Sequence, residues 1–532
     1  MRIRILVIPA LFVLSSAALI GAGLAGPGAD PRAKRAETRP AGAAPRTITV
    51  PAGGDLQAAL DRAAPGDAIA LQPGATYTGP FTLPRKAGDS WIVVRTAAPE
   101  GDFPAPGRRV DPSHAKLMPK LVAATGSVIA AAPGAHHFRF VGIEIAPKDG
   151  VYLRDLVDLS GRATTLESVP HHIAFERCYL HGDKKQGARR GIALNGRDVT
   201  VADSYLSDFK EAGAESQALA GWAGPGPFSI VNNYLEAAGE NVMFGGADPP
   251  IADLVPSDIE IRRNHLAKPL AWKAGEPGYE GKAWTVKNLL ELKNARRVVI
   301  EGNLLEGSWP QAQNGFAVLF TVRNQDGGAP WSTVEDVTFA NNIVRKTASG
   351  INILGRDDVR QSQPARRITI RNNLFEDVGG QRWGGGGTLF QILNGAAQVV
   401  IEHNTALQTG SIVLAEGPPQ EGFVYRYNIA PHNAYGIIGT NTGPGNGTIE
   451  RYFPGAVIEG NVIVGGEGPR YPRGNFFPGS LADVRFADQA GGDYRLAAGS
   501  RYRKVANGKD AGVDVEALSA AGALDTAERP LR

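Results

Sequence analysis

Cysteine is almost absent from this sequence of 532 residues, which contains only Cys178. A single thiol cannot form an internal disulfide, and Cys178 has neither a CxxC spacing nor a second cysteine that could resolve it. We therefore expect no disulfide framework. We interpret Cys178 as a small buried apolar side chain.

The sequence also lacks a large excess of charge of either sign. The net charge is +3, but residues 1–46 hold seven Lys or Arg against Asp30 and Glu37, which leaves the remainder near −2. A general basic field is missing from the part of the chain that folds, so we expect no nucleic-acid partner. An anionic ligand would need a local cluster of cations.

Long apolar runs are missing after the first 25 residues. The chain opens with "MRIRILVIPALFVLSSAALIGAGLAG", in which Arg2 and Arg4 precede an apolar stretch and then small residues. That order is typical of a cleavable secretory signal over residues 1–25, and the alternative is a retained membrane anchor. We expect a secreted or periplasmic protein with no stable membrane insertion after cleavage. Residues 26–46, rich in Pro, Ala, Gly and charge, are predicted to be a disordered linker.

One short phrase recurs along the rest of the chain. It reads "FSIVNNYLE", "IEIRRNHLA", "VVIEGNLLE", "VTFANNIVR", "ITIRNNLFE", "VVIEHNTAL" and "AVIEGNVIV" in successive copies. Each copy alternates apolar and polar residues and then turns at an asparagine, which predicts strands separated by turns. The asparagines are Asn233, Asn264, Asn303, Asn342, Asn373, Asn404 and Asn461, with Asn428 in the weaker "YRYNIA".

A unit of about 30 residues with three short strands cannot bury its apolar face alone, so successive units must stack as a solenoid. The stacked asparagines would then lie about 4.8 Å apart and form a hydrogen-bonded ladder. We expect the solenoid over residues 47–479. A short helix near residues 55–64, with Asp55 as its N-cap, should cover the first coil, and residues 480–532 should form an irregular cap and tail.

These phrases and ends resemble the right-handed parallel β-helix proteins of the pectate-lyase-like superfamily. The resemblance implies an all-β fold and spans nearly all of residues 47–520. It does not imply one reaction, because that superfamily includes lyases, hydrolases, epimerases, phage adhesins and proteins without catalysis.

The strand before each asparagine phrase should form a second sheet whose outer face is a groove suited to a long polymer. Alternation predicts that Val242, Phe244, Leu290, Leu292, Val318, Phe320, Ile351 and Ile353 point inward. The outward set is then Asn241, Met243, Glu291, Lys293, Leu319, Thr321 and Asn352. Glu291 and Lys293 share one face about 7 Å apart, with Asn241 one coil below and Arg323 one coil above.

Such a cluster suits β-elimination on a polysaccharide that contains uronic acid. That reaction needs a base for the proton at C5 and positive charge beside the neighbouring carboxylate. The order Asn, Glu, Lys, Arg over successive coils resembles the site of the chondroitinase B and alginate lyase group. The resemblance implies Ca²⁺ bound by Asn241 and Glu291, Lys293 as the base and Arg323 as its partner. Those enzymes carry a second acid where Lys293 stands, so we expect Asp248 to supply that charge.

The two longest insertions flank this strand. They hold "KPLAWKAGEPGYEGKAWTVK" and "RNQDGGAPWSTVED". We expect Trp272, Trp284 and Trp331 to stack on sugar rings, and Lys273 and Lys287 to contact carboxylates; aromatic residues that fasten loops to the coils are the alternative.

The sequence therefore predicts a monomeric polysaccharide lyase whose partner is an acidic polysaccharide. Two alternatives remain: a non-catalytic glycan-binding or cell-surface solenoid, and a polygalacturonase-like hydrolase. The acid pair Asp357 and Asp358 would serve the hydrolase, but the Gly-His-Gly and Arg-Ile-Lys signatures are absent. The histidines of "AHHF" and "PHHI" lack the spacing of metal ligands, so we expect no zinc site.

Overall fold

A computed structural model describes residues 45–527 of the chain. The expected signal at 1–25 and the expected linker up to residue 44 lie outside the described residues. The first strand begins at Thr47. Among the described residues, no helix combines the length and apolar character needed to cross a bilayer.

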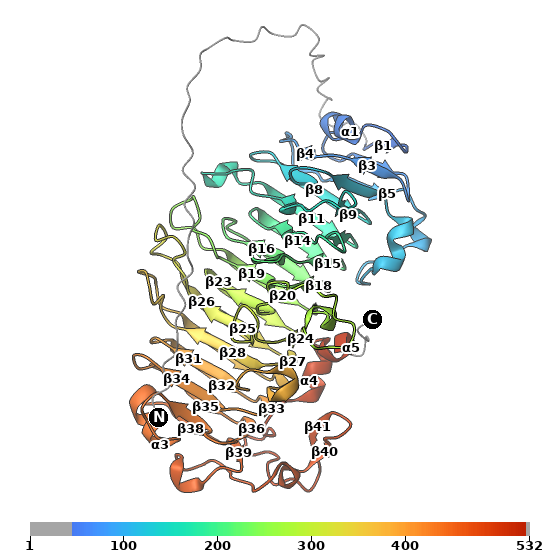
Figure 1. Cartoon of the computed structure of the whole chain (residues 1–532). Coiled ribbons are helices and arrows are strands. Elements are labelled where there is room, and N and C mark those ends of the chain that lie inside the picture. The colour runs from blue at the N-terminus through green and yellow to red at the C-terminus, as the bar shows by residue number, and fades with distance from the viewer. Residues whose placement is uncertain (1–44, 528–532) are drawn as a thin grey trace. The chain divides into compact units, whose positions relative to one another are not determined.

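The fold is a parallel β-helix in which each complete coil contributes one strand to each of three sheets (Figure 1). Sheet A has 14 strands: β1 (Thr47–Val50), β2 (Ala68–Leu71), β5 (Ile92–Thr96), β8 (His136–Val141), β11 (His171–Glu176), β14 (Arg197–Ala202), β17 (Phe228–Val231), β20 (Ser257–Arg262), β23 (Ala295–Glu301), β26 (Val334–Ala340), β29 (Arg366–Arg371), β32 (Ala397–Glu402), β35 (Val424–Arg426) and β38 (Val457–Glu459).

Sheet B follows sheet A in each coil, after the turn that carries the asparagines in the coils from Asn233 onward. It has 13 strands: β3 (Thr76–Thr78), β6 (Lys120–Ala123), β9 (Glu144–Pro147), β12 (Tyr179–His181), β15 (Tyr205–Phe209), β18 (Tyr234–Ala237), β21 (His265–Ala267), β24 (Leu304–Ser308), β27 (Ile343–Thr347), β30 (Leu374–Val378), β33 (Thr405–Gln408), β36 (Ile429–Pro431) and β39 (Val462–Val464).

Sheet C completes the coil and is the sheet of the predicted groove. It has 12 strands: β4 (Phe81–Leu83), β7 (Ile129–Ala131), β10 (Asp155–Asp158), β13 (Arg190–Ala193), β16 (Gln217–Gly221), β19 (Glu240–Phe244), β22 (Leu290–Leu292), β25 (Phe316–Thr321), β28 (Ser349–Leu354), β31 (Phe390–Leu393), β34 (Val413–Glu416) and β37 (Ile437–Gly439).

The remaining elements are short. The α-helices are α1 (Leu56–Arg62), α2 (Gly380–Trp383), α3 (Asn446–Tyr452), α4 (Val515–Ala520) and α5 (Ala523–Ala527). The 3₁₀ turns are η1 (Glu100–Asp102), η2 (Pro112–Leu117), η3 (Leu166–Ser168), η4 (Leu270–Trp272), η5 (Gly468–Arg470) and η6 (Leu481–Val484). Strands β40 (Phe486–Asp488) and β41 (Asp493–Leu496) form a separate antiparallel pair. The predicted all-β class is confirmed.

The core runs through the middle of the coils because alternation places every second strand residue inside. In sheet A, Val298, Val337, Ile368 and Val399 pair in register and form one buried column. The predicted inward residues of sheet C all belong to the same continuous core. The single thiol, Cys178, is buried, as expected.

The predicted asparagine ladder stands at the turn from sheet A to sheet B. The side-chain oxygen of Asn342 accepts hydrogen bonds from both the backbone N–H and the side-chain amide of Asn303, at 3.0 and 2.9 Å. The amide of Asn342 in turn donates to the carbonyl of Ile300 at 3.0 Å. The same pattern runs from Asn233 to Asn461 and ends on Asn475. At the other end, Ser204 donates its backbone N–H to Asn233.

The N-terminal end is covered as predicted. Helix α1 buries Leu56, Ala59 and Leu60 against the first coil, and the Asp55 carboxylate accepts the N–H of Ala58 at 2.9 Å. Such an N-cap satisfies one of the free backbone donors of the helix.

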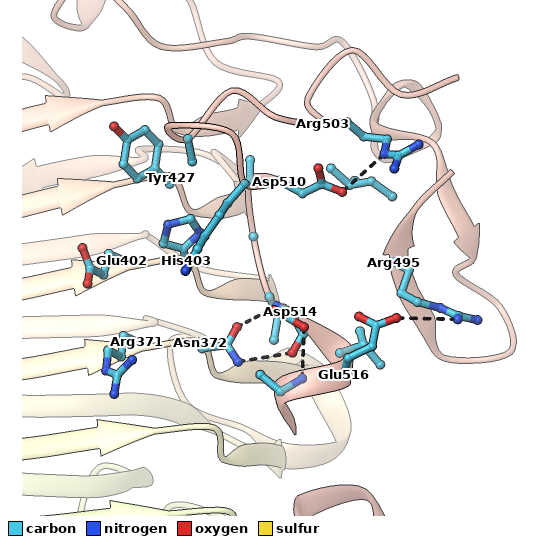
Figure 2. A pocket seen from close by; sticks show the side chains of 18 of the residues that line it. Arg371, Asn372, Glu402, His403, Tyr427, Arg495, Arg503, Asp510, Asp514 and Glu516 are labelled. Atoms are coloured by element: carbon cyan, nitrogen blue, oxygen red, sulfur yellow. Dashed lines mark hydrogen bonds and ion pairs between the residues drawn. The ribbon is translucent and has the colours of Figure 1, made fainter. Parts of the chain in front are cut away.

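The C-terminal segment, residues 480–527, continues past the last coil and lies along the outer face of sheet B. Asp514 donates its N–H to Asn372, and the Asn372 amide donates back to the carbonyl of Asp514 (Figure 2). Higher on the stack, a Cβ at Gly302 would lie 2.1 Å from the carbonyl oxygen of Ala521, so only glycine fits there. The segment covers outward apolar side chains of three coils, namely Leu304, Ile343 and Leu374.

We predict that Asn342→Ala destabilises the fold by roughly 3 kcal/mol, because two buried donors of Asn303 lose their acceptor. Unfolding in denaturant measures the change. Asn314→Ala, at an exposed asparagine, serves as the control and should change the free energy of unfolding by less than about 0.5 kcal/mol. Equal effects of the two substitutions would show that the ladder contributes nothing of its own.

Candidate functional site

A groove of about 780 Å³ lies on the outer face of sheet C. It crosses the coils of β22, β25, β28 and β31, and the loops that follow β25 and β28 contribute to one wall. We call it the sheet C groove, defined by the lining residues Lys287, Glu291, Lys293, Thr321, Arg323, Asn352 and Asp357. Three of the predicted charged site residues and Lys287 therefore share one groove.

The strand register differs from the expected one at its lowest step. Glu291 pairs with Met243 on the coil below and with Leu319 on the coil above. Asn241 therefore does not lie below Glu291, and its side chain is fully buried. Its amide donates to the carbonyls of Leu235 and Ala267. The prediction that Asn241 is a metal ligand was wrong, because its side chain is buried and its amide is committed to these two carbonyls.

The partner of Asn241 is the buried lysine Lys268. Its ammonium donates to the Asn241 side-chain oxygen and to the carbonyls of Ala237, Ala238 and Gly239, at 2.7 to 3.1 Å. Burial lowers the pKa of Lys268 to about 7. This pair satisfies the carbonyls of a buried turn and has a structural role.

Glu291 is buried at the floor of the groove, with 2% of its surface exposed. It accepts a hydrogen bond from the Asn288 amide at 3.0 Å, and the Lys293 ammonium lies 3.6 Å from its other oxygen. Burial alone would raise the pKa of this carboxyl, but the charges of Lys293 and Lys287 and the bond from Asn288 hold it below its usual range. Glu291 is therefore an anion that fixes the position of Lys293.

Arg323 lies one coil above Lys293, as predicted, and its backbone N–H donates to the carbonyl of Lys293 at 2.9 Å. Its guanidinium is held by Asp357 at 3.2 Å and by Asp358. One third of this side chain remains exposed. The acid pair Asp357 and Asp358 thus positions Arg323, and Asp357 also accepts the N–H groups of Asn324 and Val359.

The residues expected to bind calcium do not come together. Asp248 accepts the N–H groups of Asp326 and Gly328 and so holds a loop, and it does not line the sheet C groove. Asn241 is buried elsewhere, which leaves Glu291 as the one predicted ligand in the groove. Calcium takes six to eight oxygen ligands, so this donor set does not fit it. Among residues 45–527, the one group of three His, Cys, Asp or Glu side chains close enough to share an ion lies on sheet A.

The two predicted substrate-binding lysines differ in position. Lys287 lines the groove but is only 6% exposed and forms ion pairs with Glu215 and Glu240. Burial disfavours its charge, yet the three nearby glutamates raise its pKa above the usual range. Lys273 pairs with Glu276 within its own insertion and does not line the groove.

The predicted tryptophans fasten loops rather than present stacking surfaces. Trp272 and Trp284 are 4% and 2% exposed and pack with Ala238, Val286 and Trp309 in a satellite core. The ammonium of Lys210 lies over both rings, at 5.4 and 5.1 Å from their centres. The expected stacking role of these two residues was wrong, because the insertion folds back onto the coils at the turns between sheets B and C.

Trp331 is partly buried and donates its ring N–H to the carbonyl of Leu254 at 3.0 Å. It lies outside the lining of the groove. Its position therefore also supports a loop-fastening role.

Several residues of the groove escaped the sequence interpretation. Glu215 stands just before β16 of sheet C, and Gln313 comes from the short loop before β25. Asn288 stands just before β22 and is fully buried, and its amide donates to Gln313 in the groove. The one feature of the sequence that could have identified these residues is their position just before an aligned strand. Alternation assigns faces only within strands, so it could not identify them.

A second hollow, of about 730 Å³, lies between the coils and the C-terminal segment (Figure 2). Six of its charged side chains form ion pairs: Arg503 with Asp510, Arg495 with Glu516, and Arg426 with Glu402. We attribute it to the packing of that segment.

Two solved structures of comparable architecture can be set beside this one. The catalytic unit of a thermostable GH87 α-1,3-glucanase from Streptomyces thermodiastaticus matches with a TM-score of 0.51 at 14% identity, over 84% of this chain and 72% of that one. A PL6 alginate lyase in complex with a trisaccharide matches with a TM-score of 0.51 at 11% identity, over 89% of this chain and 93% of that one. No family model and no curated protein matches the sequence.

At such identities the likeness establishes the fold alone, and the chain has the parallel β-helix fold of these carbohydrate-active enzymes. One of the two is a glucanase and the other a lyase. The fold therefore does not choose between the two reactions.

We predict that Trp284→Ala loosens the insertion of residues 269–287, because it opens a cavity of a kind that costs about 3 kcal/mol or more. Limited proteolysis should then cut within this insertion. Tyr279→Ala, on the same insertion at a partly exposed ring, should leave it protected. If Trp284 were instead a stacking surface for sugars, its loss would leave protease resistance unchanged and weaken glycan binding.

Proposed function

We propose that this protein is a secreted or periplasmic polysaccharide lyase that cleaves an acidic, uronic-acid-containing polysaccharide by β-elimination. The observation that carries the proposal is the convergence of Lys293 and Arg323, from consecutive coils, in one groove across four coils of sheet C. A groove that runs along the stack suits a long polymer. Its two cations suit a carboxylate.

In this proposal the Lys293 ammonium first gives a proton to water and leaves Glu291. The neutral Lys293 amine then takes the proton from C5 of a uronic acid residue. The C4–C5 double bond forms as the C4–O glycosidic bond breaks, and the departing oxygen takes a proton from water. The Arg323 guanidinium lies beside the sugar carboxylate and stabilises the negative charge that develops there. Glu291 has a positioning role, because it holds Lys293 from the floor of the groove.

The proposal includes no calcium, since the donor set of the groove does not fit that ion. Positive charge comes from the chain itself, with Arg323 partly exposed and Lys287 deeper in the groove. We further propose that the protein acts as a monomer.

A non-catalytic glycan-binding protein is the second candidate. It is favoured by the ion pairing of the groove cations, because Lys293, Arg323 and Lys287 each have an acidic partner. A binder needs only polar groups at its surface, whereas a base must release its partner. A hydrolase of the polygalacturonase kind is less supported, since Asp357 and Asp358 are committed to Arg323.

We predict that the purified protein forms unsaturated products from at least one of pectate, alginate, chondroitin sulfate and heparin, measured by ultraviolet absorbance. Lys293→Ala should lower kcat by ~10²-fold or more, as expected for loss of a general base. Lys346→Ala changes a lysine on sheet B, away from the groove, and should leave turnover unchanged.

The competing functions give other results. Binding without any product favours the glycan-binding protein, and new reducing ends without unsaturation favour the hydrolase. Full turnover by a folded Lys293→Ala protein would rule out Lys293 as the base.

A further inference from the structure

Four histidines gather on the outer face of sheet A, far in sequence from the groove strands. They come from two neighbouring coils: His136 and His137 at the start of β8, and His171 and His172 at the start of β11. The two pairs are 35 positions apart in the sequence, but the parallel register places His171 directly beside His136. Stacking of the coils therefore brings together four histidines whose spacing in the sequence matches no metal-binding motif.

Within each pair the two rings point at one another. The Nδ1 atoms of His136 and His137 are 2.7 Å apart, and those of His171 and His172 are 2.8 Å apart. Successive strand residues normally face opposite sides of a sheet. His137 and His172 have left-handed backbones, with φ of 59° and 51°, and this break in the alternation lets both rings of each pair lie together.

The two pairs also face each other across the coils. The rings of His136 and His171 are stacked with centres 4.7 Å apart, and those of His137 and His172 with centres 4.4 Å apart. Ligand nitrogens of His136, His137 and His171 all lie within 4.8 Å of one another. Nitrogens on one tetrahedral zinc ion, with bonds of ~2.1 Å, are about 3.4 Å apart, so small ring rotations suffice to bind one ion.

The cluster is partly buried and has an aromatic and an acidic neighbour. Trp91 covers His137 from the coil below, with ring centres 5.4 Å apart, and His137 is 8% exposed. On the coil above, the Asp198 carboxylate lies 3.5 Å from Nδ1 of His172. Metal-bound histidines are commonly oriented by such a carboxylate. Arg197 pairs with Asp198, and its positive charge opposes metal binding here.

An approach path for an ion also exists. Trp91, His172 and Asp198 line one end of a hollow of about 710 Å³ on sheet A.

We propose that His136, His137, His171 and His172 form a binding site for one divalent transition-metal ion of the zinc or copper class. Imidazole nitrogens select such ions over calcium and magnesium, which prefer oxygen. The ion would join the coils of β8 and β11 through side chains, in addition to their backbone pairing. This site is independent of the lyase proposal, since it lies on sheet A and the groove lies on sheet C.

The test is calorimetric titration of the full chain, free of any affinity tag, with ZnCl₂. We expect one ion per chain, a higher melting temperature with zinc, and its reversal by a chelator. His136→Gln/His171→Gln should abolish binding, and Asp198→Asn should weaken it about tenfold or more, as for other outer partners of metal ligands. His403→Gln, which removes a histidine at a distant turn, should bind zinc as the unchanged protein does.

A second measurement needs no variant. Electron paramagnetic resonance of the protein with one equivalent of Cu²⁺ should show nitrogen couplings from at least three imidazoles. The proposal is overturned if the unchanged protein binds zinc no more tightly than millimolar, if the double variant binds as well as the unchanged protein, or if copper shows one nitrogen or none. Lyase turnover does not bear on the metal-site proposal: neither its presence nor its absence in any variant would support or contradict metal binding by the four histidines.

Discussion

The repeat distance between neighbouring coils governs this molecule. Parallel pairing sets adjacent strands about 4.8 Å apart, and every outward or inward side chain inherits that spacing from the coil below. The asparagine ladder holds the register at one turn, because each side chain accepts two hydrogen bonds from its neighbour and none of these buried groups is left without a partner. Contacts between residues about 30 or 40 positions apart become nearest-neighbour contacts. The core columns, the groove and the histidine cluster all arise in this way.

That constraint also explains how far the sequence could be interpreted. Within strands, the alternation identified the inward residues of sheet C and the outward position of Glu291, and extending it just past the strand ends placed Lys293 and Arg323 on the same outer surface. It failed at Asn241, which stands at a strand entry where the chain has just left a turn. It failed again for Trp272 and Trp284, because no periodic rule says whether a loop aromatic packs on the body or faces solvent. The histidine pairs were dismissed for lack of motif spacing, which has no meaning in a solenoid whose stacking supplies the proximity.

The sheet C groove combines charges of both signs at short range. Lys293, Arg323 and Lys287 are each held by acids, so an anionic ligand must compete with an internal counterion instead of meeting a free cation. Ion pairs of this kind contribute little net attraction, since separating or desolvating them offsets much of what a new contact gains. Discrimination among anionic ligands would then depend more on the position of a carboxylate relative to the guanidinium of Arg323 than on the total charge of the ligand.

The C-terminal segment gives the stack a mechanical property that its repeats alone lack. In a plain solenoid each coil contacts only its neighbours, so the last coil can unwind by itself. Here residue 514 is bound to residue 372, a separation of 142 positions, and Ala521 packs on Gly302 still further up the chain. Pulling on the last coil therefore loads several coils at once, in parallel. The coils that the C-terminal segment contacts should therefore resist tension together. Unwinding from this end must begin with detachment of the C-terminal segment.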